Sequence, residues 1–292
     1  MSDPPNNTKA PSDPPNNTFS DPPNNTRDLP APDEPYGQVA PLLQLAMDWL
    51  ARSEGANVPL ELAMYSLRWR GDWRLSIYRT PNEIKGVSIV MPRGDWFLEA
   101  QGSLDAAMFA NTAAIHGRHP ATLTTTERVS ALIRPFLADN GVIESEHKVQ
   151  VLKCTKPPRQ ARGRWATEAD LPQLKKYESR IPADQRKLMD TAWPALIKRK
   201  ELAVADDNNN ILASIRRYGP APSFAAIADL YEAPTRKPSN VSEELTGYVV
   251  GELLRQRKAV YVLVDEADTS SLTFFRELGF KDAETFYRAD LK

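Results

Sequence analysis

The chain has 292 residues, of which 41% are hydrophobic, and its formal net charge is −1. This length accommodates two domains, and this apolar fraction is enough for an ordinary buried core. The near-neutral charge argues against a large nucleic-acid surface, because neutralising phosphates requires a local excess of Lys and Arg, although a local basic patch is compatible with it.

Residues 1–35 form a polar tail in which the heptapeptide Ser-Asp-Pro-Pro-Asn-Asn-Thr begins at Ser2, Ser12 and Ser20. Proline removes backbone donors, Asn and Asp favour turns, and almost no apolar side chain is present to bury. Such a segment cannot offset its own ordering entropy. We therefore predict a disordered, low-complexity tail.

Residues 36–154 are predicted to form a first module with the element order α-α-β-β-β-α-β-α-β. Apolar residues at helical spacing indicate helices over 39–50 and 59–67, whereas alternating or short apolar runs indicate strands. The predicted strands cover 73–78, 86–91, 95–99, 121–125 and 147–153, and the remaining helices cover 106–110 and 127–138.

Residues 155–163 are polar, basic and rich in Pro, which predicts an interdomain linker. Residues 164–292 then form a second module, and Thr167 with Asp170 makes a near capping box at its first helix. Ala259–Val264 is almost entirely apolar, as expected for a strand buried on both faces. The other predicted strands cover 201–206, 211–218, 225–231 and 285–291, and the helices cover 184–198, 242–256 and 270–278.

The segment 225–280 has the order strand, loop, helix, buried strand, helix. A helix start after a strand binds anions, because several N–H groups lack partners and the helix dipole adds positive potential. The loop there contains Arg236, Lys237 and Ser239, which suit a pyrophosphate. A capped helix without any ligand is the alternative interpretation.

This segment resembles the GNAT acetyltransferases, which carry Arg/Gln-x-x-Gly-x-Gly/Ala to hold the pyrophosphate of acetyl-CoA on backbone amides. Lys237 falls at the Arg/Gln position, Asn240 at the first Gly and Ser242 at the Gly/Ala. Residues 230–234 are similar to the fourth strand of that family and its exit. The similarity continues in Val262-Leu263-Val264-Asp265, Ser271 and Phe274-Phe275-Arg276-Glu277-Leu278-Gly279-Phe280, which match the last family motif.

From Tyr36 onward the chain is similar to tandem GNAT proteins with a degenerate N-terminal GNAT-like domain. The implied fold class is α/β of the mixed α+β kind, with two tandem modules that each hold a mixed, mostly antiparallel sheet flanked by helices. The first module has no pyrophosphate loop between Thr122 and Val129. The resemblance implies that this module shapes the acceptor cleft or an interface, while the second binds acetyl-CoA.

The resemblance implies an N-acetyltransferase that transfers an acetyl group from acetyl-CoA to a primary amine, with the acceptor left open. A general base must take a proton from the acceptor ammonium, and Asp229 and Glu232 are the candidates, which strand alternation puts on opposite faces. The implied cofactor contacts are Leu230, Tyr231, Arg236, Lys237, Ser239, Asn240, Val241, Ser242, Ser271 and Phe275.

Three substitutions in this pattern have structural consequences. Asn tolerates the left-handed region better than other non-glycine residues, so we expect Asn240 to make the turn of the family's Gly. We expect Ser242 to cap the helix. Phe275 stands where many members carry a Tyr that protonates the departing thiolate, and we expect it to pack instead. The substitute proton donors are Tyr231, Tyr261 and Tyr287.

Two other functions stay open: a non-catalytic CoA-binding or regulatory protein on a GNAT scaffold, and an aminoacyl or other acyl transferase of tandem type. No metal is expected, because His116, His119 and His147 lack further ligands at suitable spacing. Cys154 is interpreted as a small buried hydrophobe. Without a membrane span or signal peptide, we expect a cytoplasmic protein with no membrane or nucleic-acid partner, and homodimerisation is left open.

Overall fold

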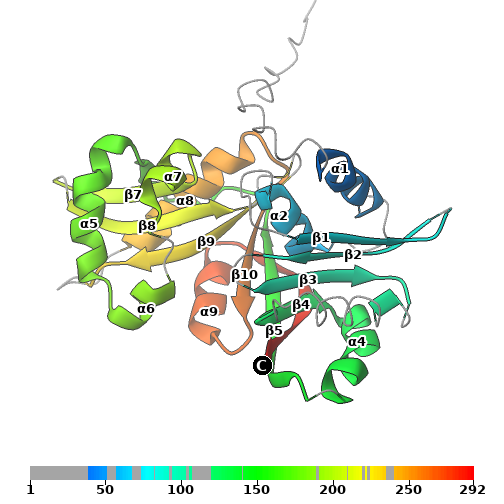
Figure 1. Ribbon diagram of the computed structural model, residues 1–292. Helices are drawn as coiled ribbons and strands as arrows, with labels where there is room; N and C mark the ends of the chain where they lie inside the picture. The colour runs from blue at the N-terminus through cyan, green and yellow to red at the C-terminus, as the bar shows by residue number, and fades with distance from the viewer. Residues whose placement is uncertain are drawn as a thin grey trace, which may run out of the picture.

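The computed structural model describes most of the chain from Val39 to Lys292 (Figure 1). The residues outside the description are 1–38, 51–56, 68–73, 82, 92–93, 103–104, 107–119, 140, 189–190, 209, 219–220, 222–223 and 235–239. The predicted disordered tail and most of the predicted helix over 106–110 therefore lie outside the described residues.

The first half of the chain contains helices and strands close to the predicted ranges. Its helices are α1 (Val39–Leu50), α2 (Val58–Leu67) and α4 (Glu127–Asp139). Its strands are β1 (Arg74–Arg79), β2 (Ile84–Val90), β3 (Asp95–Ala100), β4 (Thr122–Thr126) and β5 (Ile143–Cys154).

The second half begins with the predicted capping interaction, in which the Thr167 N–H donates to Asp170 Oδ2 at 2.7 Å. Its strands are β6 (Arg164–Trp165), β7 (Leu202–Asp207), β8 (Asn210–Tyr218), β9 (Phe224–Glu232), β10 (Ala259–Asp265) and β11 (Lys281–Leu291). Its helices are η3 (Glu168–Asp170), α5 (Leu171–Arg180), α6 (Ala183–Leu188), α7 (Trp193–Lys198), α8 (Val241–Leu254) and α9 (Thr269–Glu277).

The prediction of one long helix over 184–198 is wrong, because α6 ends at Leu188 and α7 begins only at Trp193. Pro194 lies in the first turn of α7. A proline ring clashes with the carbonyl four residues earlier in a continuous helix, whereas it is tolerated in a first turn, where its missing N–H has no partner to lose.

The described strands form one sheet of eleven strands, in the order β1-β2-β3-β4-β11-β5-β10-β9-β8-β7-β6. The sheet is mixed, since β3 with β4 and β9 with β10 are parallel whereas the other pairs are antiparallel. The mixed α/β class predicted from the sequence is thereby confirmed.

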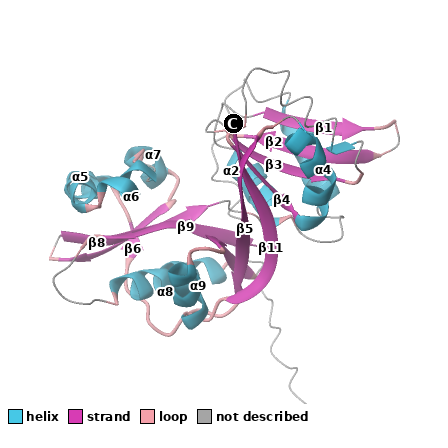
Figure 2. Cartoon of the chain, turned by 90° about the horizontal axis from the view of Figure 1, so that it is seen from below, coloured by secondary structure: helices cyan, strands magenta, loops and turns pink. Residues whose placement is uncertain are grey.

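The strands β5 and β11 exchange places between the two halves of the chain (Figure 2). β5, the last strand of the first half, pairs with β10 through Leu152 opposite Val262. β11, the last strand of the chain, pairs with β4 through Tyr287 opposite Thr125, and also with β5. The division at residues 155–163 stays a prediction, but the hydrogen bonding of the sheet runs across it.

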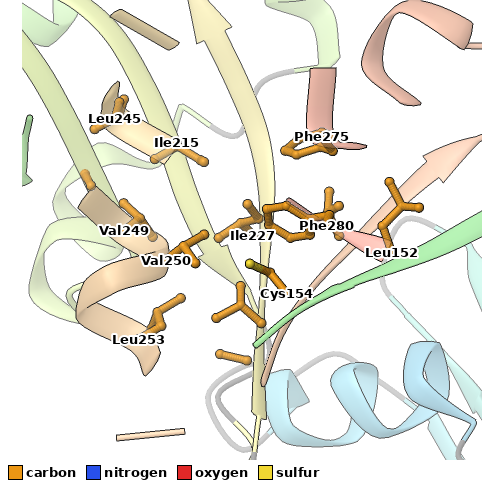
Figure 3. Close-up of a cluster of buried hydrophobic side chains, with 14 of the residues drawn as sticks. Leu152, Cys154, Ile215, Ile227, Leu245, Val249, Val250, Leu253, Phe275 and Phe280 are labelled. Atoms are coloured by element: carbon orange, nitrogen blue, oxygen red, sulfur yellow. The ribbon is translucent and has the colours of Figure 1, made fainter. Parts of the chain in front are cut away.

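Helices cover both faces of the second-half sheet. On the α8 face, α8 and α9 pack on β7 to β10 around an apolar cluster that includes Ile215, Ile227 and Phe275 (Figure 3). On the opposite α5 face, α5 and α7 pack on β7 and β8, and the central helix α2 contacts β5 and β11. The helix α2 thus joins the first half of the chain to the centre of the sheet.

The segment predicted as the linker packs across α8 at two glycines. A Cβ on Gly247 would lie 1.8 Å from the carbonyl oxygen of Gln160, so only glycine permits this approach. A Cβ on Gly251 would lie 3.9 Å from Pro157, which is ordinary van der Waals contact. The linker is therefore part of the packed structure at Gly247.

Candidate active site

The parallel strands β9 and β10 diverge in the middle of the second-half sheet, and we call this opening the fork. Their pairing runs from Phe224 opposite Ala259 only to Ile227 opposite Val262. Beyond those residues β9 follows β8 to Glu232, while β10 stays paired with β5 (Figure 1). One edge of each strand is therefore not covered by the other.

A β-bulge reshapes β9 immediately after the fork. Asp229 has φ 52°, in the left-handed region that few non-glycine residues adopt, and Asp is among those that tolerate it. Arg216 of β8 pairs with Ala228 of β9, and Ser214 of β8 pairs with Tyr231 of β9. Two steps along β8 therefore correspond to three steps along β9, so β9 contains one extra residue. The bulge thereby shifts the alternation of side chains by one residue.

Asp229 pairs with Arg216 at this bulge, with 2.6 Å between Asp229 Oδ2 and Arg216 Nη1. The Arg216 side chain is only 10% exposed and the Asp229 side chain 28%. Arg216 alternates with Ile215 of the α8 face, which puts the ion pair on the α5 face. Arg216 is not recognisable as a candidate from the sequence, because an Arg within an alternating strand is typical of a solvated position.

Glu232 lies on the other face and contacts the start of α8. The Ser242 hydroxyl donates to Glu232 Oε2 at 2.6 Å. The two candidate bases thus lie on opposite faces. The shift at the bulge falls between Ala228 and Asp229, so the side chains alternate regularly from Asp229 to Glu232. Ser242 spans from the first turn of α8 to the end of β9 and does not occupy the cap position, which belongs to Asn240.

The prediction that Asn240 takes a left-handed conformation is wrong, because its φ is −95° and its ψ is 21°. Its backbone enters α8 directly, and its carbonyl accepts the N–H of Glu244 at 2.9 Å. The physical reason is that a residue starting a right-handed helix needs negative φ. The preceding loop residues Thr235, Arg236, Lys237, Pro238 and Ser239 lie outside the described residues.

A buried tyrosine of α5 reaches β9 from the α5 face. The Tyr177 hydroxyl donates to the carbonyl of Tyr231 at 2.7 Å and lies 3.1 Å from Ser214 Oγ. Burial raises the pKa of Tyr177 above its ordinary value. Tyr177 fits the apolar stripe of α5 with Leu174, so the sequence offers no signal that its hydroxyl holds β9.

No family model matches the sequence, and no curated protein does. Solved structures do resemble it. A GNAT-family acetyltransferase from Colwellia psychrerythraea has a TM-score of 0.60 at 10% identity, covering 88% of this chain and 97% of its own. A tandem GNAT protein from the clavulanic acid biosynthesis pathway has 0.55 at 14%, covering 89% and 96%. The chain has the tandem GNAT fold.

A third structure agrees with this assignment of the fold. The GCN5-related N-acetyltransferase from Sphaerobacter thermophilus has a TM-score of 0.54 at 16% identity, covering 87% of this chain and 91% of its own. Coverage of this extent includes both halves of the chain, so the similarity is not confined to the second half.

The last helix of this GNAT fold, α9, contributes packing at the position expected to contact cofactor. Phe275 is 6% exposed and packs edge-on against Phe274 and Phe280 in the α8-face cluster (Figure 3). Phe275 thus packs, as expected for a Phe in place of the family's Tyr, and its contact with the cofactor stays a prediction. The N–H of Ser271 donates to Asp268 Oδ1 at 3.0 Å, which caps α9.

The three tyrosines suggested as alternative proton donors, Tyr231, Tyr261 and Tyr287, each have identifiable contacts within the protein. The Tyr287 hydroxyl donates to Glu146 Oε1 at 2.6 Å, beside the cluster under α4. Tyr261 packs edge-on against Phe224, with ring centroids 5.3 Å apart. Tyr231 packs against the cluster under α5 and α7. None of the three has a position that assigns it as the proton donor.

Other polar groups have structural partners. His147 Nε2 lies 2.7 Å from Asp290 Oδ2, while His116 and His119 lie outside the described residues. Within the described ranges, no group of three His, Cys, Asp or Glu side chains could hold a metal ion.

Cys154 is 1% exposed, and burial raises the pKa of its thiol. No described helix is long and apolar enough to cross a membrane.

Proposed function

We propose that the chain is an N-acetyltransferase that moves the acetyl group of acetyl-CoA to a primary amine. The divergence of β9 and β10 beyond Ile227 and Val262, ahead of the helix start at Val241, supports this best. An uncovered strand edge binds the amide groups of an extended ligand, and a helix start binds an anion. The pantetheine arm and the pyrophosphate of acetyl-CoA supply both kinds of group.

The proposed cofactor orientation follows from the order of these elements. The pyrophosphate would lie at the α8 start near Val241 and Ser242, with Arg236, Lys237 and Ser239 added from the loop. The pantetheine would run along Leu230 and Tyr231 towards the fork. Asp229 is three residues closer to the fork than Glu232, and so closer to the proposed position of the thioester.

We infer that Asp229 is the general base. Its carboxylate takes a proton from the acceptor ammonium, and the amine nitrogen then attacks the thioester carbonyl carbon. The C–N bond forms and the C–S bond breaks. The nitrogen then loses its second proton to water, and water delivers a proton to the departing thiolate. The pairing with Arg216 orients the carboxylate, and holding amine and thioester together supplies much of the rate enhancement.

One observation favours the non-catalytic alternative. The Glu232 carboxylate accepts a hydrogen bond from Ser242, and Glu243 and Glu244 follow in the first turn of α8. These charges suit the helix dipole but oppose a pyrophosphate. Acetyl-CoA binding without turnover of any amine would favour this alternative.

The test combines calorimetry with turnover of an amine panel. We expect Glu232→Gln to bind acetyl-CoA several-fold more tightly, because it removes a negative charge at the α8 start, and exposed Glu277→Gln on α9 to change nothing. Asp229→Asn should keep the affinity within about threefold and lower kcat about 10²- to 10⁴-fold. An absence of heat at millimolar acetyl-CoA would refute the proposal.

A further inference from the structure

Positive side chains gather at the end of the second-half sheet that lies opposite the α8 start. β7 begins there at Leu202, β8 ends at Tyr218 and β10 begins at Ala259. The residues that meet at this end are 198–202, 217–218 and 252–260. The acidic residues among them are Glu201 and Glu252, and each pairs with one arginine. The basic residues are Lys198, Arg199, Lys200, Arg217, Arg255, Arg257 and Lys258.

Three of these residues, Arg199, Arg217 and Arg257, form what we call the arginine cluster. Arg217 Nη2 donates to the carbonyl of Arg199 at 2.9 Å, and Arg199 Nη2 pairs with Glu201 at 2.9 Å. The Arg217 guanidinium also lies over the Trp165 ring, 6.0 Å from its centroid. Burial lowers the pKa of Arg217, Glu201 raises it, and the nearby charge of Arg257 lowers it.

The arginine cluster contains donors that the described protein leaves unused. The Nε atoms of Arg199, Arg217 and Arg257 are buried and have no hydrogen-bond partner among the described residues. With Glu201 as counter-ion, three arginines keep a formal net charge of +2. Burying unsatisfied donors and uncompensated charge is costly, so an anion at this place would stabilise the fold.

The C-terminal end of α8 explains only part of the arrangement. Cations after the last turn of a helix are stabilised by its dipole, and this accounts for Arg255 and Arg257. It does not account for Arg199 and Arg217, which belong to the strands and turns beside it.

We propose that the arginine cluster binds the phosphate group of a small phosphorylated molecule. A phosphate dianion matches the charge of +2, and its oxygens accept from the planar donor groups of arginine. The site is distinct from the proposed pyrophosphate position, because α8 has 14 residues and separates its two ends by on the order of 20 Å.

The experiment titrates inorganic phosphate into the full chain by calorimetry at constant ionic strength, without acetyl-CoA. We expect one saturable site, weakened at least about tenfold by Arg257→Gln, and by less in Arg257→Lys, which keeps the charge. Arg255→Gln is the matched control, since it removes the same charge from the same loop at a side chain that is 75% exposed. It should change the affinity by less than about twofold.

Several results would overturn the proposal. They are no saturable phosphate binding, equal losses in Arg255→Gln and Arg257→Gln, or displacement of phosphate by acetyl-CoA, which would place it at the α8 start. A short single-stranded RNA that binds more tightly than phosphate, with a steep dependence on salt, would indicate a nucleic-acid ligand instead. Circular dichroism of each variant separates loss of binding from loss of folding.

A negative result for phosphate binding and a negative result for the proposed acetyltransferase activity can be told apart. Phosphate binding is measured without acetyl-CoA, and acetyl-CoA binding is expected to be unchanged in Arg257→Gln.

Discussion

Arg216 Nη1 lies 2.6 Å from Asp229 Oδ2 at the residue where β9 adopts a left-handed conformation. Asp229 is therefore both the residue with left-handed backbone at the bulge and one partner of the ion pair. The positive φ of Asp229 lowers the stability of the fold, whereas its ion pair with Arg216 raises it.

Replacing Asp229 separates these two contributions. Asp229→Gly and Asp229→Ala both remove the carboxylate, but only glycine adopts φ 52° without a steric cost. We expect the alanine variant to be less stable than the glycine variant by about 1 kcal/mol in urea unfolding. Equal stabilities would show that the bulge relaxes when the ion pair is lost.

The two glycines of α8 predict opposite responses to alanine. Gly247→Ala should destabilise the chain by about 3 kcal/mol, because its Cβ would meet the Gln160 backbone at 1.8 Å. Gly251→Ala meets only Pro157 at 3.9 Å, so helix propensity should make it neutral or stabilising by up to about 1 kcal/mol. Thermal melts of both variants check the difference, and equal shifts would contradict the packed linker.

Fragments cut at the predicted linker test the strand exchange. Residues 36–154 lack β11 between β4 and β5, and residues 155–292 lack β5 beside β10. We expect neither fragment to melt cooperatively alone, because each leaves open strand edges and an uncovered core. Co-expression of both should restore a cooperative transition. A cooperative melt of residues 36–154 by themselves would show independent domains.

Asp170 predicts an acid-dependent loss of stability. Arg164 donates to both Asp170 oxygens at 2.7 Å, which lowers the pKa of Asp170 to about 2. Because the folded pKa lies below the unfolded one, the stabilisation is present above about pH 4 and is lost as the pH falls towards 2. Since Arg164 is 41% exposed, screening limits the effect to about 1–2 kcal/mol.

Urea unfolding of the native chain and Asp170→Asn at pH 7 and near pH 2.5 measures this effect. The stability difference should be largest at pH 7 and should shrink at the lower pH. A difference that does not change with pH would assign Asp170 a purely steric role.

Local patterns in the sequence determined the elements of this protein well. Helical spacing placed α1 over Val39–Leu50, and Thr167 with Asp170 marked the start of the second half. Gly279, with φ 92°, follows α9, which ends at Glu277, one residue before the predicted end at 278. Periodicity, caps and helix stops involve residues within a few positions of each other, so the sequence displays them directly. The motif around the last strands likewise indicated the GNAT fold that the structure has.

Only the tertiary structure decided how these elements combine into the candidate site. The exchange of β5 and β11, the bulge at Asp229 and the contact of Tyr177 with β9 each join residues far apart in the chain. Such pairings depend on which strand edges and faces remain uncovered after the other elements have packed. For this reason the sequence suggested Asp229 and Glu232 as candidates, whereas the fold supplied their partners, Arg216 and Ser242.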